Sequence, residues 1–597
     1  MSEEDLAMFE GSEFEIRTTY PAEESYESSN KYNDLSPVTD VVSVLHVSKK
    51  IIMAVITSKT TVHLRTDRSI TQLMLENASN TDPTKVICED TLTGKTFTYG
   101  GLRDDAFKAA HSLRHGYGIA PGDVVTIISR STVDYILAAH AIWSAGAVVS
   151  TINHSSTPKE LVHALRILKP KVIIVDVAVL NKLHGALTTL DMNSSVTIFT
   201  LIQREANYPL FPEDLVKSCR IESEAYVLDG KDARKSCAAI VLSSGTTGLQ
   251  KAVMLSHHNL VAICEQLRAH NPDNWRGSMR EVFFPPLSHI YGLYVCALLG
   301  PWLGYYVCLL PAFDLETFCR LLQEKRATLA RLVPPVALAL AESPITEKYR
   351  YDDLEYFSCS AAPLKPLVAT KLRTKFPGVS LCQTYGCTEL SSCVSQSGVR
   401  DKNAPLVATG TLLANMKVRF IDENGKDVSP PNAGEICVSS PTIMMGYKDD
   451  PKATEDAMLE PGWYRTGDIG YLNSEGFLII VDRIKDVIKY KGFQVSPTEL
   501  EEIIGQHPIV ADAAVTSVWD DTEATEIPQA FVIPKVKVFS SEREKLSQEI
   551  QKMVASKVSG YKRLRGGVLF VDQLPRNPTG KLLRRELRSL ARLKAHI

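Results

Sequence analysis

The sequence predicts an α/β fold, with a large N-terminal α/β domain built from several subdomains and a small α+β C-terminal domain. Three observations predict this fold. Short β-branched runs alternate with helical patterns, the alternation continues past residue 400 without a clear linker, and the pattern changes near residue 483. A chain of 597 residues, 44% of them hydrophobic, can also bury a large core. A wholly disordered chain and a disulfide miniprotein are excluded.

The N-terminal segment differs in composition from the rest of the chain. Residues 1–40 contain eleven acidic side chains and only two basic ones, Arg17 and Lys31. Such a segment cannot bury enough apolar surface to offset the entropy lost on ordering. We therefore expect residues 1–60 to form an acidic extension without stable structure, followed by one large domain over 61–482 and a smaller one over 483–597.

The large domain shows an alternation of strand and helix patterns. Three β-branched runs predict strands, and two intervening patterns predict helices: VVTIISR (124–130), AVVST (147–151) and VIIVD (172–176) for the strands, and ILAAHAIWSAG (136–146) and KELVHALRILK (159–169) for the helices. Such alternation is typical of βαβ units. It predicts a mostly parallel sheet with helices on both faces.

The smaller domain has its own pattern. The segment FVIPKVKVF (531–539) predicts a strand. Over residues 542–558, Leu546, Ile550, Val554 and Val558 recur every four residues, which is the spacing of one helix face. We expect a compact α+β unit here.

Charge and cysteine content exclude several classes of protein. The formal charge is −3, so there is no bulk attraction to nucleic acid, and no nucleic-acid partner is expected. The twelve cysteines contain no C-x-x-C pair, which favours thiols in a reducing compartment over a zinc or disulfide framework.

The start is acidic, unlike a secretory signal, and no early apolar stretch is long enough to span a bilayer. We expect an intracellular protein with no transmembrane segment. The tripeptide Ala595-His596-Ile597 resembles a peroxisomal address in residue class, which leaves peroxisome and cytoplasm open.

A glycine- and hydroxyl-rich loop follows a buried-strand pattern at residues 238–242. It reads Ser243-Ser244-Gly245-Thr246-Thr247-Gly248-Leu249-Gln250-Lys251. Its glycines let backbone N–H groups approach an anion, and Lys251 adds a positive charge. The loop lacks the G-K-[ST] ending of a Walker A motif, so a P-loop NTPase is not supported. Phosphate binding is favoured, although a loop of this kind alone is a weak signal.

Further motifs follow in order along the chain: PLSHIYG (286–292), QTYGCTE (383–389), GWYRTGD (462–468), DRIK (482–485) with IKYKGFQ (488–494), and PRNPTGK (575–581). With the loop at 243–251, this series resembles the adenylate-forming superfamily from about residue 67 to 588. The resemblance is greatest to its 4-coumarate–CoA ligase and acyl-CoA ligase branch. It implies an enzyme that uses ATP and Mg²⁺ to activate a carboxylic acid as an acyl-adenylate and then transfers the acyl group to coenzyme A.

The same resemblance implies roles for individual residues. Lys581 would lie between the acid and the α-phosphate, and His289, Thr388 and Glu389 would complete the catalytic set, with Glu389 also binding Mg²⁺. Asp468 and Arg483 would contact the ribose. The full ATP- or AMP-binding set is Ser243, Ser244, Gly245, Thr246, Thr247, Gly248, Lys251, Gln383, Thr384, Tyr385, Thr388, Asp468, Arg483 and Lys581. The acyl-adenylate would meet Tyr291, Ala361, Lys485 and Lys489, and coenzyme A would meet Lys491 and Gly492. The small domain would be mobile, with a hinge within Asp482 to Lys485.

The sequence departs from the family pattern at two positions, one in the phosphate loop and one near the proposed acid site. Ala252 stands where the phosphate loop usually has glycine, and Val295 stands where the plant coumarate enzymes place a hydroxyl residue. The second change favours an apolar acid, aliphatic or aromatic. A peptide-synthetase adenylation domain is disfavoured, because residues 283–295 contain no Asp or Glu to bind an α-amine. A luciferase-like enzyme with another acceptor and a non-catalytic nucleotide-binding relative remain alternatives. The sequence does not specify the oligomeric state.

Overall fold

The computed structural model describes residues 55–219, 225–228, 230–243, 250–401, 404–491, 493–520, 522–523, 525–577 and 580–595, with side chains up to residue 590. The chain divides into two compact units, Met1–Ile52 and Met53–Ile597, and the described residues belong to the second. Several predictions concern positions outside the described residues: the acidic extension up to residue 54, the loop residues Ser244, Gly245, Thr246, Thr247 and Gly248, the coenzyme A residue Gly492, and the C-terminal His596 and Ile597.

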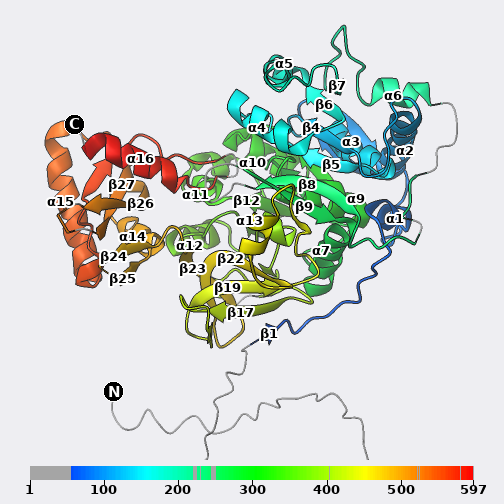
Figure 1. Ribbon diagram of the computed structural model, residues 1–597. Coiled ribbons are helices and arrows are strands. Elements are labelled where there is room, and N and C mark those ends of the chain that lie inside the picture. The colour runs from blue at the N-terminus through cyan, green and yellow to red at the C-terminus, as the bar shows by residue number, and fades with distance from the viewer. Residues whose placement is uncertain are drawn as a thin grey trace, which may run out of the picture. The chain divides into compact units, whose positions relative to one another are not determined.

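The first sheet contains the strands predicted from the β-branched runs. Its members are β4 (Val124–Ile128), β5 (Val148–Thr151), β6 (Val172–Asp176), β7 (Thr197–Leu201), β8 (Cys237–Ser243), β9 (Lys251–Ser256) and β20 (Gly446–Tyr447). Within the described residues the strand order is β20-β9-β8-β5-β4-β6-β7. The strands β4 to β9 are labelled in Figure 1. The strands from β8 to β7 are parallel neighbours. At the other side, β9 pairs antiparallel with β8, and β20 pairs antiparallel with β9. The predicted parallel sheet is confirmed.

Helices cover both faces of this sheet. Those around it are α2 (Tyr99–His115), α3 (Val133–Ser144), α4 (Pro158–Leu168), α5 (Leu180–Thr189) and α7 (His257–His270). Val125 and Ile127 of β4 share one core cluster with α3, whereas Ile128 shares another with α4 and α5. Since successive side chains of a strand point to opposite faces, the two clusters lie on opposite sides of the sheet. Every residue of α3 is buried, in keeping with its mostly apolar sequence.

The second sheet positions several of the predicted site residues. Its strands are β2 (Val86–Asp90), β3 (Thr96–Thr98), β10 (Arg280–Phe283), β11 (Tyr306–Leu309), β12 (Leu329–Leu332), β13 (Tyr356–Cys359), β14 (Ser380–Tyr385), β15 (Ser395–Gln396) and β16 (Thr411–Leu412). The five from β11 through β10, β12, β13 and β14 are parallel neighbours. His289, Ala361 and Tyr385 lie at or just beyond the carboxyl ends of β10, β13 and β14. Ligands bind at this edge in open α/β sheets.

The third sheet is antiparallel. It comprises β1 (Ile56–Thr57), β17 (Lys417–Ile421), β18 (Asp427–Val428), β19 (Gly434–Ser439), β21 (Met458–Glu460), β22 (Trp463–Leu472) and β23 (Leu478–Arg483). Asp468 of β22 pairs with Arg483 of β23 in the strand register. This pairing brings together two residues that are fifteen positions apart in the chain.

Shorter elements connect the three sheets. Helices α10 (Leu315–Glu324), α11 (Pro334–Glu342) and α12 (Pro366–Lys375) contribute to the core cluster around the second sheet. The remaining helices are α1 (Ile70–Leu75), α6 (Glu213–Ser218), α8 (Ile290–Gly292), α9 (Gly300–Leu303) and α13 (Pro451–Asp456). Single turns are η2 (Val177–Val179), η4 (Pro344–Lys348), η5 (Thr388–Leu390) and η6 (Gly560–Lys562), and η3 (Leu293–Leu299) is a π-helix.

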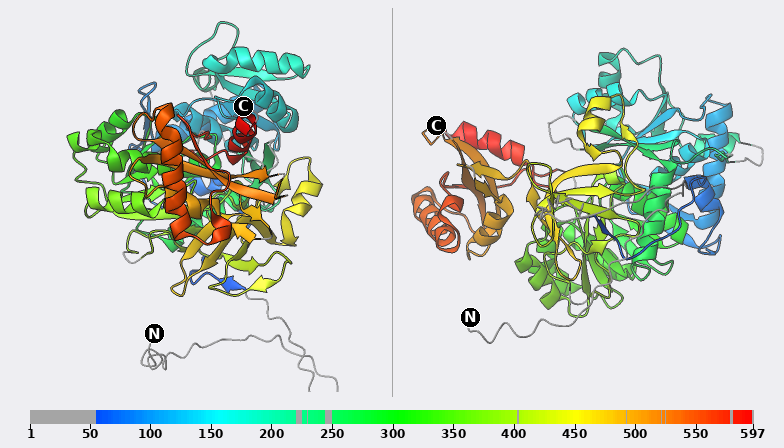
Figure 2. Two further views of the ribbon diagram at one scale, coloured as in Figure 1. Left: turned by 90° about the vertical axis from the view of Figure 1, so that its left-hand side faces the viewer. Right: turned by 60° about the horizontal axis from the view of Figure 1, so that its bottom comes forward.

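The C-terminal part is an α+β unit, as predicted. It contains β24 (Ile488–Tyr490), β25 (Phe493–Val495), α14 (Pro497–Ile504), β26 (Val510–Asp520), β27 (Thr525–Pro534), α15 (Ser540–Lys557), β28 (Val568–Phe570) and α16 (Arg584–Ala595). Helices α15 and α16 pack beside the sheet of β26, β27 and β28 (Figure 2). The helix predicted over 542–558 is confirmed. The strand predicted over 531–539 is wrong in its second half, because β27 ends at Pro534.

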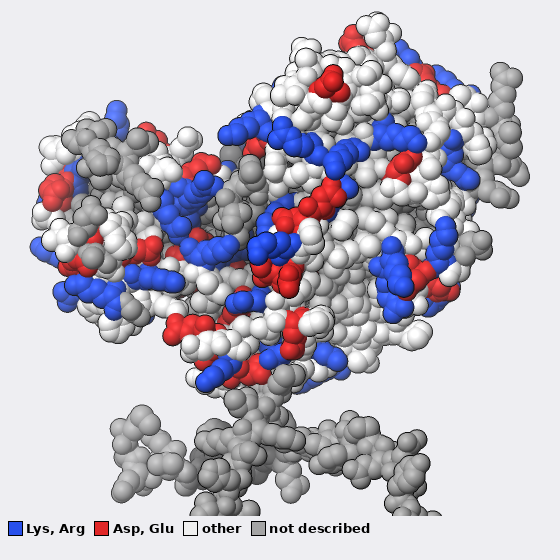
Figure 3. All heavy atoms as spheres, in the orientation of Figure 1, with Lys and Arg blue, Asp and Glu red and all other residues white. Residues whose placement is uncertain are grey.

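No helix among the described residues is long and apolar enough to cross a membrane. On the face drawn in Figure 3, Lys and Arg side chains are interspersed with Asp and Glu. That face is therefore not a block of one charge sign.

Candidate active site

The predicted phosphate loop connects the two strands of an antiparallel hairpin. Ser243 at the end of β8 pairs with Lys251 at the start of β9, and the glycines and threonines between them lie outside the described residues. The Lys251 ammonium lies 4.6 Å from the centre of the Tyr447 ring, within the range of a cation–π contact. The hairpin therefore places a positive charge at the base of the loop.

Thr388 and Glu389 form the first two residues of η5, and both are buried. The Tyr447 hydroxyl donates a hydrogen bond to Glu389 Oε1 at 3.0 Å. The ring of the same tyrosine carries the Lys251 ammonium on its face. One side chain thus joins the predicted phosphate-binding cation to the predicted metal-binding carboxylate. The sequence did not indicate Tyr447, since a lone tyrosine outside the recognised motifs carries no signal.

The donor set at Glu389 suits a magnesium ion that arrives with ATP. Among the described residues, no group of three His, Cys, Asp or Glu side chains could hold a metal ion. Magnesium, however, is usually bound by one or two carboxylates, with substrate phosphates and water completing its shell. A single glutamate near the hairpin predicted to bind phosphate fits this pattern.

Asp468 lies at the centre of a buried polar cluster. Its Oδ2 accepts a hydrogen bond from the Tyr385 hydroxyl at 2.8 Å, and its Oδ1 accepts one from Arg483 Nε at 2.7 Å. The charge of Asp468 raises the pKa of Arg483 above its usual value. Each carboxylate oxygen retains a second lone pair for a ligand hydroxyl. The three side chains that the sequence placed at the nucleotide are therefore brought together.

Gln383, Thr384 and Ala361 occupy the ends of β14 and β13. Gln383 Nε2 donates to the carbonyls of Leu406 and Ala408, at 2.7 and 3.1 Å, so its amide fixes the adjacent loop. Ala361 is exposed and has φ of 76°. A non-glycine residue in this region is uncommon, and such strain is found preferentially at functional sites.

His289 is held as a neutral hydrogen-bond donor. It caps α8 by accepting, at Nδ1, the Tyr291 backbone N–H at 3.2 Å, so the proton of the neutral ring is on Nε2. Burial, and then the positive charge of Lys581, lower the pKa of His289 to about 4. The ring is therefore uncharged at neutral pH, with Nε2–H available to a substrate oxygen.

Lys581 lies beside the Asp468 cluster. A side chain at the preceding residue, Gly580, would place its Cβ 3.2 Å from Val333, so this loop packs against the start of α11. Burial, and then the charge of Arg483, lower the pKa of Lys581 to about 8. The electrostatic coupling of Lys581 to Arg483, Asp468 and His289 unites residues from motifs that are far apart in the sequence.

The structure adds a buried ion pair that the motifs did not reveal. Arg331 Nε on β12 donates to Glu281 Oε2 on β10 at 2.6 Å, and both side chains are at most 2% exposed. Arg331 Nη1 also donates to the Tyr291 hydroxyl at 3.2 Å. The sequence did contain a signal, because charged residues interrupt two otherwise strand-like segments, REVF and LARL.

The lysines assigned to the acyl-adenylate and coenzyme A do not all lie near the Asp468 cluster. Partial burial and the charges of Lys251 and Arg483 lower the pKa of Lys485. Lys485 therefore lies close enough to these two cations to be repelled by them. Lys489 and Lys491 instead belong to the β24 segment, where their backbone N–H groups donate to Glu526 and to Thr525. The Lys491 ammonium pairs with Glu523 at 3.4 Å.

The segment predicted to contain a hinge is attached on both sides. The Ile484 N–H donates to the Gly467 carbonyl at 2.9 Å, in the turn before Asp468. The next carbonyl, that of Lys485, accepts from Arg588 of α16 at 3.0 Å. The backbone at Ile484 is therefore bonded to the β22 segment of the large domain, and the backbone at Lys485 is bonded to α16 of the C-terminal part.

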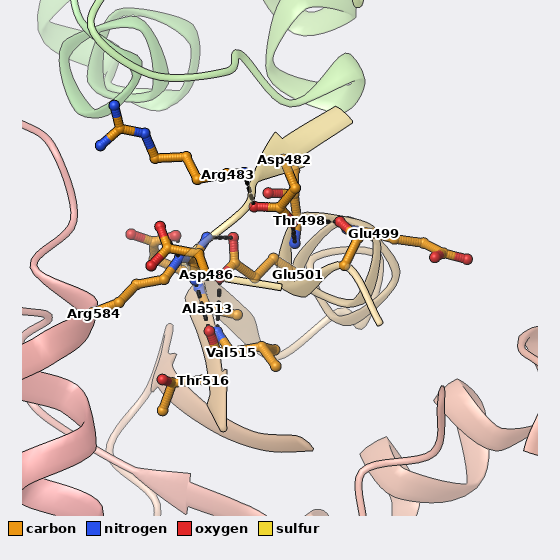
Figure 4. Close-up of polar contacts among 12 residues, drawn as sticks. Asp482, Arg483, Asp486, Thr498, Glu499, Glu501, Ala513, Val515, Thr516 and Arg584 are labelled. Carbon is orange, nitrogen blue, oxygen red and sulfur yellow. Dashed lines mark hydrogen bonds and ion pairs between the residues drawn. The ribbon is translucent and has the colours of Figure 1, made fainter. Parts of the chain in front are cut away.

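Charged side chains fix the C-terminal side of this segment (Figure 4). Arg584 of α16 bonds Glu501 of α14 and lies 3.5 Å from Asp486. Asp482 Oδ2 accepts from the Ser496 hydroxyl at 2.5 Å. Because Asp482 also pairs with Ile469 in the third sheet, its contact with Ser496 links the large domain to the C-terminal part. The hinge within Asp482 to Lys485 stays a prediction.

Cys387 also lies in this region, between Tyr385 and Glu389. It is half-buried, and burial followed by the charges of Glu389 and Asp468 raises the pKa of its thiol well above the usual value. The thiol therefore stays protonated at neutral pH.

The chain matches the family model described as AMP-binding enzyme over residues 75–448, and the one described as AMP-binding enzyme C-terminal domain over residues 499–581. It is 33% identical over 537 residues to probable 4-coumarate–CoA ligase 2 of Dictyostelium discoideum, covering 88% of this chain and 95% of that relative. It is also 33% identical to 4-coumarate–CoA ligase 2 of Petroselinum crispum, covering 83% and 89%. The crystal structure of ATP-bound MatB from Rhodopseudomonas palustris superposes with a TM-score of 0.76 at 25% identity, covering 88% of this chain and 99% of MatB.

Proposed function

Because the chain belongs to the AMP-binding enzyme family of the adenylate-forming superfamily, we propose that it joins a largely apolar carboxylic acid to coenzyme A in two steps. ATP first converts the acid to an acyl-adenylate, and the thiol of coenzyme A then displaces AMP. The relatives named 4-coumarate–CoA ligase support this reaction class.

The position of Lys581 is the observation that carries the proposal. Its ammonium is electrostatically coupled to Asp468 and Arg483, which are proposed to bind the nucleotide, and to His289, which is proposed to lie beside the acid. A cation between a nucleotide site and an acid site suits a reaction that joins two anions.

In the first step, a carboxylate oxygen attacks the α-phosphorus, an O–P bond forms, and pyrophosphate leaves. Lys581 would stabilise the negative charge that gathers on the α-phosphate oxygens, and Lys251 would neutralise the departing pyrophosphate. His289 Nε2–H would donate to the acid and hold it in line. Mg²⁺, held by Glu389 and the phosphates, would add further positive charge at the phosphates.

In the second step, the sulfur of coenzyme A attacks the acyl carbon, the C–O bond to AMP breaks, and the thiol proton passes to solvent. Lys489 and Lys491 lie outside the Asp468 cluster and are the residues we propose for this step. Rotation of the C-terminal part about Ile484 and Lys485 would exchange Lys581 for the β24 segment at the site.

Apolar side chains support an apolar acid. Phe283, Tyr294 and Val295 are buried next to Tyr291, whose ring centre lies 6.0 Å from that of Phe283 and 5.6 Å from that of Tyr294. Tyr291 is the partly exposed member of this group, so we propose that its ring meets the acid, with the buried residues packed behind it.

The test measures exchange of pyrophosphate into ATP over fatty, aryl and branched acids, followed by thioester formation with coenzyme A. Lys581→Ala should lower exchange by about 10²–10³-fold, since it removes a cation that acts on the developing charge. Lys552→Ala, an exposed lysine on α15, is the matched control and should leave exchange unchanged.

Three outcomes would contradict the proposal. Normal exchange by the Lys581→Ala variant would remove the assigned role of this lysine. Adenylation without thioester formation would favour an enzyme with another acceptor, of the luciferase-like kind. Failure with every acid, while ATP still binds, would favour a non-catalytic nucleotide-binding relative.

A further inference from the structure

We propose that Asp512 is a positioning residue for the first step of the reaction. It holds Arg576, whose guanidinium supports the backbone next to Lys581, and it also binds Lys365 of the large domain. This inference rests on the proposed function, and it specifies how the C-terminal part is held while the acid is adenylated and which contact breaks before the second step.

The Arg576 side chain connects Asp512 to the backbone beside Lys581. Arg576 Nη2 donates to Asp512 Oδ2 at 2.7 Å, and Arg576 Nη1 donates to the Gly580 carbonyl at 2.9 Å. Gly580 directly precedes Lys581 and has φ of 81°, in the left-handed region that favours glycine. One guanidinium therefore joins β26, where Asp512 lies, to the residue before Lys581.

Asn577 fixes the backbone of Lys581 by hydrogen bonds of its own. The Lys581 N–H donates to Asn577 Oδ1 at 2.8 Å, and the Asn577 N–H donates to the Lys581 carbonyl at 2.9 Å. The Gly580 N–H donates to the Asn577 carbonyl at 2.8 Å. These bonds hold Lys581 relative to its own turn, whereas the Arg576 contacts hold that turn against β26. Loss of the Asp512 carboxylate would let the turn shift as a unit.

A second contact of Asp512 crosses to the large domain. Lys365, at the N-cap of α12, donates from Nζ to Asp512 Oδ1 at 3.1 Å, and the two side chains are 28% and 22% exposed. Burial opposes ionisation of Asp512, but the charges of Lys365 and Arg576 outweigh it and hold the pKa of this carboxyl below its ordinary value. Asp512 is therefore charged at neutral pH and binds two cations at once.

The two contacts of Asp512 differ in what the proposed rotation does to them. Asp512 and Arg576 both belong to the C-terminal part, so they move together and their hydrogen bond can persist. Lys365 belongs to the large domain, so its ion pair with Asp512 has to break. A pair that water partly reaches suits such a change, because solvent can replace each partner. The Lys365 contact is thus specific to the first step.

The experiment measures the two steps separately. Pyrophosphate exchange reports the first step, and thioester formation from a supplied acyl-adenylate and coenzyme A reports the second. Asp512→Asn should lower kcat for exchange by about tenfold, in line with the loss of a hydrogen bond to a charged group. KM for ATP should change by less than about threefold, because Asp468 and Arg483 are unaltered. Thioester formation from the acyl-adenylate should stay within about twofold of the wild-type rate.

A double-mutant cycle distinguishes positioning from a general structural defect. When Lys581 is already replaced by alanine, Asp512→Asn should lower exchange by no more than about twofold, because no ammonium is left to position. A merely structural role would lower exchange by the same factor in both backgrounds. Arg576→Met offers a second route to the same test, since it should reproduce the effect of Asp512→Asn and add little to it.

Lys365→Met tests the contact with the large domain. It should lower exchange by about two- to fivefold, less than Asp512→Asn, because a partly exposed ion pair contributes little. It should not slow thioester formation, and Lys365→Arg should keep the exchange rate by keeping the charge. The matched control is Lys371→Met, another lysine of α12, whose partner Glu342 lies on α11 of the same domain. That control should leave both steps unchanged.

The possible results separate the two proposals. If Lys581→Ala loses exchange while Asp512→Asn keeps it, the present inference is wrong and the proposed function stands. An Asp512→Asn variant that slows both steps equally, or that loses the same factor with and without Lys581, would also overturn the inference. If the wild-type protein adenylates no acid of any kind, the proposed function itself fails.

Discussion

Two arginine–carboxylate pairs in this protein use the same chemistry in different surroundings. In the Asp468–Arg483 pair the arginine side chain is 33% exposed, and both carboxylate oxygens have protein partners. In the Glu281–Arg331 pair the arginine is 2% exposed, and among the described residues Glu281 Oε1 and Arg331 Nη2 lack hydrogen-bond partners. The first pair can rearrange around a ligand with the help of solvent. The second pair is enclosed by protein, so solvent does not reach either side chain.

The largest expected effect is on stability. Arg331→Met alone should lower the free energy of unfolding by about 3–5 kcal/mol, because it leaves the Glu281 carboxylate buried and unpaired. Arg483→Met should cost much less, since water reaches that pair. Urea unfolding of both variants measures the difference. Equal losses would show that the two pairs do not differ in the way that their exposure indicates.

The next effect concerns ATP. Asp468→Asn should lower kcat/KM for ATP by about 10–100-fold, because hydrogen bonds to a charged group contribute about 1.5–3 kcal/mol. The loss should be the same for every acid, since Asp468 is proposed to contact only the nucleotide. Steady-state kinetics with two acids of different size test this. A loss that depends on the acid would place Asp468 in the acid site instead.

A third prediction concerns pH. The pKa of Lys581 lies below its ordinary value of 10.5, at about 8, so its ammonium is present below this pH and is lost above it. In the free enzyme, kcat/KM for adenylation should fall by up to about tenfold per pH unit above 8.

Variants at the two pairs separate the causes of this decline. Asp468→Asn should move its onset to lower pH, because the carboxylate of Asp468 raises the pKa of Lys581. The Glu281→Leu/Arg331→Met variant should leave the onset in place. A profile that stays flat up to pH 10 would contradict the assigned role of Lys581.

The smallest effect is expected at Tyr447. Tyr447→Phe keeps the ring under Lys251 but removes the hydrogen bond to Glu389, so KM for ATP should rise only a few-fold, in line with about 0.5–1.5 kcal/mol for one hydrogen bond. Tyr447→Leu, which also removes the aromatic face, should raise it further. Identical values for the two variants would show that the cation–π contact contributes nothing to ATP binding.

The fold of the large domain could be predicted from sequence because its buried strands are short β-branched runs. Residues 124–128 and 172–176 are strands in the structure, as expected. Hydrophobic periodicity did not predict where β27 ends, since Val536 continues the strand pattern but is 60% exposed. The residues after Pro534 include Val536 and Phe539, which are exposed, so their apolar side chains do not mark a buried strand.

The residues proposed to bind the nucleotide were easier to find from sequence than the residues around the proposed acid site. Asp468, Arg483 and Lys581 belong to short motifs whose residue types are recognisable in one dimension. Arg331 and Glu281 are fifty positions apart and meet only because β10 and β12 are neighbours in the sheet. Tyr447 lies on β20 of the first sheet, whereas its partner Glu389 lies in η5, which follows β14 of the second sheet. Such pairings depend on strand order, which local sequence does not contain.

The protonated thiol of Cys387 has a consequence for the fidelity of the reaction. An acyl-adenylate is an electrophile that any nearby thiolate would attack, and the second step requires that only the thiol of coenzyme A does so. With its pKa raised by burial and by Glu389 and Asp468, Cys387 is a poor nucleophile at neutral pH. Burial of this thiol, aided by the charges of Glu389 and Asp468, therefore disfavours acylation of Cys387.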